Sequence, residues 1–458
     1  MKRNGVALYL ATLAAAALPS VTHAQGFGLN EIGSCAVGRG FAVTGSPCRD
    51  ASTIYWNPAA ATSIEGLSVL VGGAAISLNG QFQADVTGRV DEANVPTEVP
   101  PHAFINWRQS PRLALGLGVY VPYGLTSQWR NDFPGRFAAQ RASLQTIYVQ
   151  PNIAYDVVPG RLSIGGGPVI GHSSVELKQG IDAISSNAQL ALAGVLPGTE
   201  IGRAALEGDA FAYGAHVGVY ARPLPTLTVG VRYLTELNFK YDDARARFTQ
   251  SVTGLRIPRT PTPSDPSTFF LLDTAVARQF NASGPLVSQK VKTAISHPAQ
   301  LQFGLGFSGL PNTTLSLDGA YVQWSSFKEL EVNFAGGAPD RTLFEDYKNI
   351  WSVRTGIEHR FAMGIAGRAG FSFAQTPAPD ETVSPLLPDM DRYNLSLGVG
   401  IPLGSRLTLD AAYLSVQTEG RRGRIGERTS RTQTAEQLNS GVYSLNANIF
   451  SLSFKAQL

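Results

Sequence analysis

Residue types that could carry out chemistry are few in this chain, and only the two cysteines lie close together. Cys35 and Cys48 have no histidine and no third cysteine near them, so we expect no metal site there. A catalytic nucleophile needs a nearby base. The six histidines are scattered without a serine or acidic motif around them: His23, His102, His172, His216, His297 and His359. We therefore expect no catalytic residues, no enzyme activity, no cofactor and no metal.

Residues 1–24 have the pattern of a secretory signal peptide. Lys2 and Arg3 form a positive start, Val6 to Leu18 form an apolar run, and a small-residue cleavage site ends at Ala24. We expect export rather than a buried N-terminal helix. Disulfides persist outside the cytoplasm, so a bridge between the two cysteines is expected in the mature chain.

Composition excludes several classes of protein. Only 16% of the 458 residues are charged, while 22 Phe, 15 Tyr and 5 Trp are present, which argues against disorder. Lys and Arg number 37 against 34 acidic residues, so nucleic-acid binding has no electrostatic basis. Mean hydropathy is -0.01, and beyond the signal peptide no apolar run reaches the length of a membrane-spanning helix.

Apolar and small or polar residues alternate with a period of two, which is typical of β-strands. In residues 301–308, for example, Leu301, Phe303, Leu305 and Phe307 alternate with Gln302, Gly304, Gly306 and Ser308. Many such runs reach nine residues or more, the length that a tilted strand needs to cross a bilayer. Fourteen strands are expected at 66–80, 101–109, 112–124, 143–158, 161–178, 211–222, 226–248, 291–308, 313–335, 348–361, 364–374, 390–401, 405–416 and 441–458.

Short and long connections alternate strictly between these strands. An even strand number with tight turns at one rim and long loops at the other predicts an all-β protein, a 14-stranded antiparallel transmembrane β-barrel of the bacterial outer membrane. Both termini are then periplasmic, and the barrel occupies 66–458. The largest loops are 179–210, where we expect short helices including Ala204-Ala205-Leu206, and 249–290. Their apolar residues predict either a self-packed cap or a hydrophobic docking surface.

Residues 25–65 have neither strand nor helix periodicity, and they contain both cysteines. Such a segment cannot line a membrane face. A barrel of this size has room inside for a folded segment, so we expect an N-terminal hatch within the lumen.

Five short motifs occur along the mature chain in an order that resembles the FadL-type outer-membrane transporters of long-chain fatty acids and other hydrophobic compounds. They are Gly26-Phe27-Gly28-Leu29-Asn30-Glu31, Asn57-Pro58-Ala59, Tyr123-Gly124-Leu125-Thr126, Trp324-Ser325-Ser326-Phe327 and Leu387-Pro388-Asp389-Met390-Asp391-Arg392-Tyr393. The resemblance runs from about residue 25 to the C-terminus. The family fold is a fourteen-stranded barrel blocked by an N-terminal hatch, in agreement with the strand pattern.

The resemblance also implies a route and residue roles. Ligand would be captured in an apolar groove between loops 179–210 and 249–290, pass to a pocket with Phe27 near its floor, and leave sideways beside a kinked third strand. Asn57, Pro58 and Ala59 would belong to the hatch, and Pro122, Tyr123 and Gly124 to the kink. Pro122 lacks an N–H and Gly124 lacks a side chain, so a break in strand pairing there is physically reasonable. The alternative is that these three residues merely end the strand.

The head-group site is less clear from the sequence. In the family that the chain resembles, basic residues near the end of the fifth strand and in the fifth outer loop can meet a carboxylate. The resemblance therefore implies Lys178, Arg341 and Lys348 as candidate cations, although Glu345 lies nearer the matching place in that loop. Long-chain fatty acids are the favoured substrates, and aromatic or aliphatic hydrocarbons are the alternative. The alternative role of the three cations is that of solvated charges at the rim of the barrel. A polar-solute porin, an outer-membrane enzyme and an adhesin are the competing functions. Outer-membrane lipid and lipopolysaccharide are the expected surroundings of a monomer that binds no nucleic acid.

Overall fold

The computed structural model describes residues 26–85, 87–258, 269–423 and 440–458. The signal peptide expected at 1–24 lies outside this range. The predicted fold is confirmed: the chain forms a closed, antiparallel 14-strand β-barrel. The first and last strands close it, with Ser68 opposite Gln457 and Ala84 opposite Gly441.

Four of the spanning strands are interrupted, so each is described in two pieces. The strands are β1 (Leu67–Ala84), β3 (Pro101–Arg108), β4 (Leu113–Tyr120) continued by β5 (Gly124–Gln128), β6 (Arg141–Val158), β7 (Leu162–Asp182), β8 (Glu200–Leu224), β9 (Leu227–Leu234) continued by β10 (Leu237–Gln250), β13 (Gln289–His297) continued by β14 (Gln300–Leu310), β15 (Thr313–Val322) continued by β16 (Glu329–Phe334), β18 (Ile350–Arg360), β19 (Ala366–Ala374), β20 (Arg392–Leu403), β21 (Leu407–Gln417) and β23 (Gly441–Gln457).

Shorter elements fill the loops and the lumen. The short strands are β2 (Val90–Glu92), β11 (Arg256–Pro258), β12 (Phe269–Leu271), β17 (Arg341–Phe344) and β22 (Arg421–Gly423). The helices are α2 (Ser34–Gly38), α3 (Thr53–Trp56), η1 (Pro58–Ser63), η2 (Pro134–Phe137), α4 (Ala183–Ser186), η3 (Ala188–Ala193), α5 (Leu272–Val276), η5 (Ala277–Gln279), η6 (Trp324–Ser326), η7 (Ala362–Gly364) and η8 (Asp380–Thr382). No helix in the described residues is long and apolar enough to span a membrane.

The outer face of the wall is apolar. On β14 the side chains of Leu301, Phe303, Leu305 and Phe307 are exposed, whereas Gln302 between them is buried in the lumen. The strand register sets Leu301 opposite both Tyr233 and Tyr321, and Tyr321 opposite Trp351. Such a row of aromatic residues is typical of the girdle at a membrane interface.

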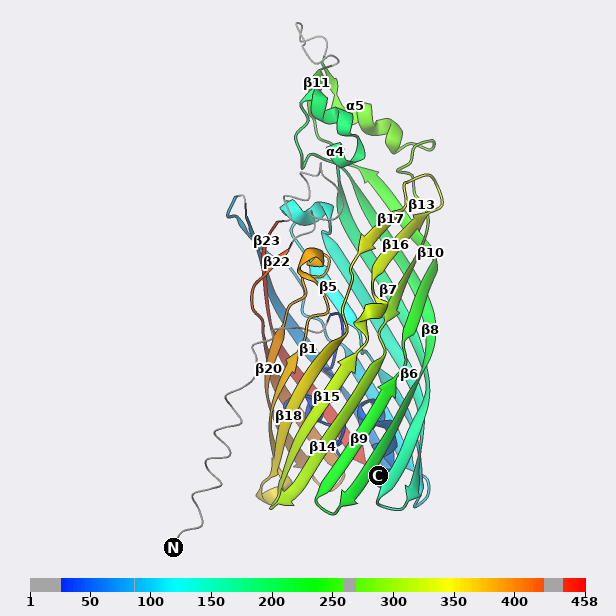
Figure 1. Cartoon of the computed structure of the whole chain (residues 1–458), viewed down its shortest axis with the longest axis vertical. Coiled ribbons are helices and arrows are strands. Elements are labelled where there is room, and N and C mark those ends of the chain that lie inside the picture. The colour runs from blue at the N-terminus through cyan, green and yellow to red at the C-terminus, as the bar shows by residue number, and fades with distance from the viewer. Residues whose placement is uncertain (1–25, 86, 259–268, 424–439) are drawn as a thin grey trace.

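The two rims differ as the sequence predicts. Tight turns lie at one rim, where the C-terminus is found, and the long loops with α4 and α5 lie at the other (Figure 1). Three of the four interruptions, in β9/β10, β13/β14 and β15/β16, occur in adjacent strands. The last pairs on the short-turn side are Leu234 with Gln300 and Gln300 with Val322, so these breaks lie at one level of the wall.

The largest loops are shorter than the sequence predicts. β7 continues to Asp182 and β8 begins at Glu200, so the first loop is only 183–199. Ala204-Ala205-Leu206 is not helical but lies in β8, with Leu206 opposite Leu177. Helix propensity is a weak preference, and here the strand ladder overrides it. In the second loop β10 reaches Gln250 and β13 begins at Gln289.

The segment before β1 is folded inside the lumen, where Figure 1 draws it in blue. We call residues 26–65 the hatch. Its helix α2 packs against β19, β20, β21 and β23, and its helix η1 packs against β4, β6, β7 and β8. Gly165 and Gly218 give η1 its room, because a Cβ at either position would stand within 3.0 Å of hatch atoms. The hatch thus contacts opposite sides of the wall.

Candidate functional site

The third spanning strand is broken between β4 and β5. Val121, Pro122 and Tyr123 lie opposite only Thr146 and Ile147, because Tyr120 pairs with Tyr148 and Gly124 already pairs with Gln145. One strand therefore carries an extra residue, which is the geometry of a β-bulge. The kink expected from Pro122, Tyr123 and Gly124 coincides with this bulge, within the wall.

The start of the hatch pairs with the bulge. The backbone nitrogen of Leu29 donates to the Pro122 carbonyl oxygen at 2.8 Å, and that of Gly124 donates to the Phe27 carbonyl oxygen at 3.0 Å. Gly28 and Tyr123 form the bridge between these two bonds. Pro122 has no N–H to offer a neighbouring strand, and its carbonyl oxygen accepts its hydrogen bond from the hatch inside the lumen.

Beside the bulge the wall is incomplete. Along the described chain β5 pairs in register only with β6. Its other side faces residues 93–100, which it meets through a backbone bond from Asn94 N to Gln128 O at 2.8 Å and a side-chain bond from Thr126 Oγ1 to Glu98 Oε1 at 3.1 Å. Continuous pairing resumes only where Ala103 faces Val119. We call the stretch between residues 93–100 and β5 the lateral gap.

A mostly apolar cavity of about 360 Å³ runs from the lumen into this gap. Phe27, Phe41 and Ile449 line it from inside, whereas Val99 and Ile147 line it from the outer face, where they are 59% and 47% exposed. The other apolar residues that line it are Leu29, Ile76, Leu78, Ala93, Val95, Pro96, Pro100, Pro101, Val121, Leu125, Trp129, Leu144, Leu387, Pro388, Val416, Leu445 and Ala447. One cavity therefore joins the interior to the lipid side of the wall.

Phe27 lies at the centre of a cluster of rings on one side of the cavity. Its ring makes edge contacts with Trp324 at 4.7 Å, Phe327 at 5.5 Å, His297 at 5.6 Å and Tyr123 at 5.9 Å between centroids. The sequence placed Phe27 near the pocket floor, and the structure gives it a cavity position surrounded by aromatic side chains. Displacing the ring would open space next to the cavity.

The polar end of the cavity contains an ion pair. Arg392 Nη2 donates to the Gly26 carbonyl at 3.0 Å and lies 3.3 Å from Asp389 Oδ1. The other Asp389 oxygen accepts from Gly26 N at 2.9 Å and from Thr376 Oγ1 at 2.7 Å. Glu31 also lines the cavity, and burial raises the pKa of its carboxyl group above the usual range. The start of the hatch is thus fixed to the loop before β20.

A fully buried hydrogen-bonded chain connects the two sides of the bulge. Gln300 Nε2 donates to Tyr123 Oη at 2.7 Å, and Arg232 Nη2 donates to Gln300 Oε1 at 3.0 Å. Arg232 Nη1 also donates to His216 Nε2 at 3.3 Å. His216 Nδ1 and Tyr120 Oη then both donate to Gln150 Oε1, at 3.1 and 2.5 Å. Residues on both sides of the bulge are therefore linked through one guanidinium group.

The same chain reaches the hatch. Gln150 Nε2 donates to the Ile54 carbonyl at 3.1 Å, and the Arg232 guanidinium lies 4.8 Å above the Tyr55 ring. Arg232 makes no salt bridge with any carboxylate in the described residues. The position of Arg232 depends on the neutral acceptors Gln300 and His216 and on the ring face of Tyr55. Through these contacts Arg232 connects the bulge, the wall and the hatch.

The Asn57-Pro58-Ala59 motif joins the hatch to the wall. Asn57 Nδ2 donates to the carbonyls of Thr44 and Val219, both at 3.1 Å, and its Oδ1 accepts from Ala59 N at 3.2 Å. Pro58 is the first residue of η1, a position that tolerates the missing N–H, and its carbonyl accepts from Asn152 on β6. All three residues thus hold η1 against the wall.

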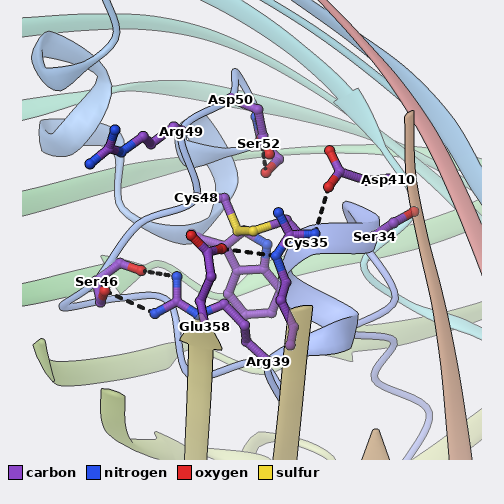
Figure 2. The surroundings of a disulfide bond; sticks show 12 residues. Ser34, Cys35, Arg39, Ser46, Cys48, Arg49, Asp50, Ser52, Glu358 and Asp410 are labelled. Carbon is purple, nitrogen blue, oxygen red and sulfur yellow. Dashed lines mark hydrogen bonds and ion pairs between the residues drawn. A yellow bond between two sulfur atoms is a disulfide. The ribbon is translucent and has the colours of Figure 1, made fainter. Parts of the chain in front are cut away.

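Cys35 and Cys48 are joined by a disulfide within the hatch, shown in Figure 2. Arg39 lies beside the bridge and donates to Ser46 O at 2.9 Å and Ser46 Oγ at 2.8 Å. It also donates to Ser316 Oγ of β15 at 3.1 Å. The covalent bond and Arg39 together hold the part of the hatch between the cysteines in one conformation.

The three candidate head-group cations lie elsewhere. Lys178 is at the outer end of β7, paired with Glu176, which also accepts from Arg141 at 2.7 Å. Arg341 is exposed on β17, and Lys348 lies in the loop before β18. None of the three lines the cavity, and the structure does not bring them together. Arg392 lines the cavity instead. The only feature of the sequence that pointed to Arg392 was the motif from Leu387 to Tyr393, which contains it.

The two large outer loops pack against each other. Leu190 and Val195 from the first loop and Ile201 at the start of β8 are buried with Ile257, Leu272 and Val276 from the second loop. Apolar side chains also remain exposed on this cap, including Leu192 at 78% and Val252 at 91%. The interior of the cap is therefore filled by its own residues, as in the self-packed alternative.

Comparison with known proteins identifies a matching family and similar sequences. The family described as outer membrane protein transport protein (OMPP1/FadL/TodX) matches residues 15–458. The long-chain fatty acid transport protein of Escherichia coli O6:H1 is 22% identical over 433 residues, covering 89% of this chain and 92% of that protein.

Two solved structures share the fold. A Pseudomonas aeruginosa FadL homologue superposes with a TM-score of 0.78 at 20% identity, over 94% of this chain and 100% of its own. The Pseudomonas putida toluene transporter TodX gives a TM-score of 0.68 at 14% identity, over 95% and 100%.

Proposed function

Because the chain belongs to the outer membrane protein transport protein (OMPP1/FadL/TodX) family, we propose that it takes up hydrophobic small molecules passively and releases them sideways through the lateral gap. It is an outer-membrane protein, and the family transports hydrophobic compounds across that membrane. The observation that carries the proposal is the cavity lined both by Phe27 in the lumen and by Ile147 on the lipid face.

The sideways route has a physical reason. An apolar solute gains about 0.8 kcal/mol for each CH₂ group that stays out of water, so an aqueous pore is a poor path for it. A cavity that opens on the lipid face lets the solute pass directly from the apolar cavity into the apolar interior of the membrane. Movement down a concentration gradient then needs no other energy source.

Opening of the route involves the start of the hatch. Phe27, Gly28 and Leu29 line the cavity and also pair with the bulge, so their displacement widens the cavity and frees the Pro122 carbonyl in one motion. The exposed apolar residues of the outer cap give a first contact surface for ligand. The protein acts as a monomer surrounded by lipid and lipopolysaccharide, and the proposal includes no enzymatic step.

Long-chain fatty acids, favoured by the sequence, and hydrocarbons both fit this route. Relatives named for each exist, among them a long-chain fatty acid transport protein and a toluene transporter. The three cations that favoured a carboxylate are absent from the cavity lining, so the substrate class has to be argued from the residues that do line it.

A reversible cross-link across the lateral gap tests the route. Cysteines in place of Glu98 and Thr126, whose side chains meet across the gap, should form a disulfide that stops uptake of a radiolabelled hydrophobic probe until reductant is added. Cysteines in place of Ala103 and Val119, which already face each other in the ladder, form the matched control and should leave uptake unchanged. Full uptake through the cross-linked gap would exclude lateral exit.

A further inference from the structure

The charges that line the cavity are mainly negative. Of its lining residues, Glu31, Glu98 and Asp389 are acidic, and Arg392 is the one Lys, Arg or His among those that the structure describes. We propose, on the basis of the function proposed above, that this cavity selects neutral hydrophobic molecules carrying a hydroxyl or similar hydrogen-bonding group, and discriminates against fatty-acid carboxylates.

The single cation is already paired. Arg392 is only 25% exposed and contacts both the Gly26 carbonyl and Asp389, whose side chain is completely buried. Asp389 also accepts bonds from Gly26 N and Thr376, so it is fixed in place beside the guanidinium group. A ligand carboxylate at Arg392 would therefore stand next to another carboxylate, and like charges at close range disfavour each other.

Glu31 adds to this preference when it is ionised, and it can bond a hydroxyl group in either protonation state. It lines the cavity from the hatch, is close enough to Arg392 to interact electrostatically, and accepts a hydrogen bond from Asn30 N at 2.9 Å. When ionised, it repels a ligand carboxylate and accepts a bond from a hydroxyl group. When protonated, it donates to a neutral oxygen. A hydroxyl group is thus compatible with both forms.

The exit contains a third carboxylate. Glu98 lies in the lateral gap, where it accepts from Thr126 Oγ1, and a ligand that leaves through the gap must pass it. Val99 and Ile147 at the mouth are apolar, and Thr126 and Gln145 beside them are polar but uncharged. A neutral molecule meets no electrostatic barrier there, whereas a carboxylate must be separated from Glu98 in surroundings of low polarity.

Binding of two probes of equal chain length tests this selectivity. 1-Decanol and decanoate are titrated at pH 8 into the purified full-length barrel in mild detergent, with intrinsic tryptophan fluorescence as the signal. A Trp129→Phe variant identifies the contribution of Trp129, which is one of five tryptophans and lines the cavity. Both affinities are corrected for partition into detergent. We expect decanol to bind about 10-fold more tightly or better, a difference of at least 1.4 kcal/mol.

Variants identify the cause. Glu31→Gln should strengthen decanoate binding and reduce the preference to about 3-fold or less, and Asp389→Asn should do the same if it folds. Glu236→Gln, at an exposed position between β9 and β10, is the matched control and should keep the wild-type preference.

Decanoate binding as tight as decanol in the wild type would overturn the selectivity while leaving the transport route intact. Unchanged discrimination in Glu31→Gln and Asp389→Asn would overturn the assigned cause. Failure of both probes to bind would instead count against the cavity as the ligand site, and so against the proposed function itself.

Discussion

Leu29 donates its backbone N–H to the carbonyl oxygen of Pro122, so that a residue of the hatch completes the hydrogen bonding of a broken wall strand. The partner that a neighbouring strand would normally supply is here part of the hatch. The hydrogen bonding of the wall at Pro122 therefore depends on the position of the first residues of the hatch.

Leu29→Pro should detach the start of the hatch from the bulge, because proline has no N–H to donate. We expect faster hydrogen exchange in residues 26–31 and at the Gly124 amide, whose acceptor is the Phe27 carbonyl, together with larger single-channel conductance. Leu29→Ala retains the N–H and is the control, with exchange at Gly124 close to wild type. Equal exchange in both variants would show that this bond does not hold the segment.

Arg232→Met should destabilise the barrel and the hatch together. It leaves Gln300, His216 and the Tyr55 ring without their shared partner, and each buried polar group left unpaired costs about 1–3 kcal/mol. A lowered unfolding midpoint in detergent and faster exchange around Ile54 are expected. Arg247→Met on β10, where Arg247 is 63% exposed, should change the midpoint little. Loss of stability without any change around Ile54 would contradict the proposed link to the hatch.

Removal of the disulfide should loosen the hatch without opening the barrel. Closing a short loop of this size typically stabilises a fold by about 2–4 kcal/mol. The double variant Cys35→Ala, Cys48→Ala should therefore show faster exchange in residues 34–50, measured by mass spectrometry, while the β1–β23 pairing keeps its protection. Both sulfur atoms are buried, so reductant should act on the folded wild type only slowly. Rapid reduction of the native protein would contradict this packing.

Because of Glu345, which lies in an outer loop, we expect the stability of the folded protein to depend on pH. Burial raises the pKa of its carboxyl group to about 8, well above its value in the unfolded chain. Because the folded state binds the proton more tightly, the stabilising contribution is complete at low pH and is lost as pH rises from about 4.5 to about 8, by at most about 1.4 kcal/mol per pH unit.

Unfolding midpoints at pH 5 and pH 8 measure this effect. The wild type should lose stability at the higher pH, and Glu345→Gln should be much less sensitive because it cannot ionise. Glu329→Gln, at an exposed position on the neighbouring β16, should behave like the wild type. An identical pH response in Glu345→Gln would assign the dependence to another group.

The strand number could be predicted because alternation is a local property of each segment, as in Leu301 to Ser308. The breaks within strands were harder to predict. The predicted strand 226–248 contains Thr235 and Glu236, which interrupt it, yet neither residue type marks a break. At 298–299 the proline is a visible signal, since it cannot donate to a ladder.

The cavity could be predicted only in part. Phe27 and the Pro122 kink followed from a family resemblance, and both line or adjoin the cavity. The polar end combines Gly26 and Glu31 with Arg392, which lies 366 positions after Gly26 and meets them only because the barrel closes around the hatch. Lys178 is cationic but is paired with Glu176, which lies two positions earlier on the same face of the strand, so the strand period could have indicated this contact.

The breaks in β9/β10, β13/β14 and β15/β16 have a mechanical consequence. Since they lie side by side at one level, the wall on that side has a crease. The outer parts of these strands, β10, β13 and β16, join the inner parts through short stretches outside the regular ladder. A force applied to the outer cap would bend the wall along this crease instead of breaking the strand pairs on the short-turn side of it. Tyr123 Oη donates a hydrogen bond to the Pro298 carbonyl oxygen at the crease. Bending at the crease would therefore also displace the bulge that contains Tyr123, on the opposite side of the lumen.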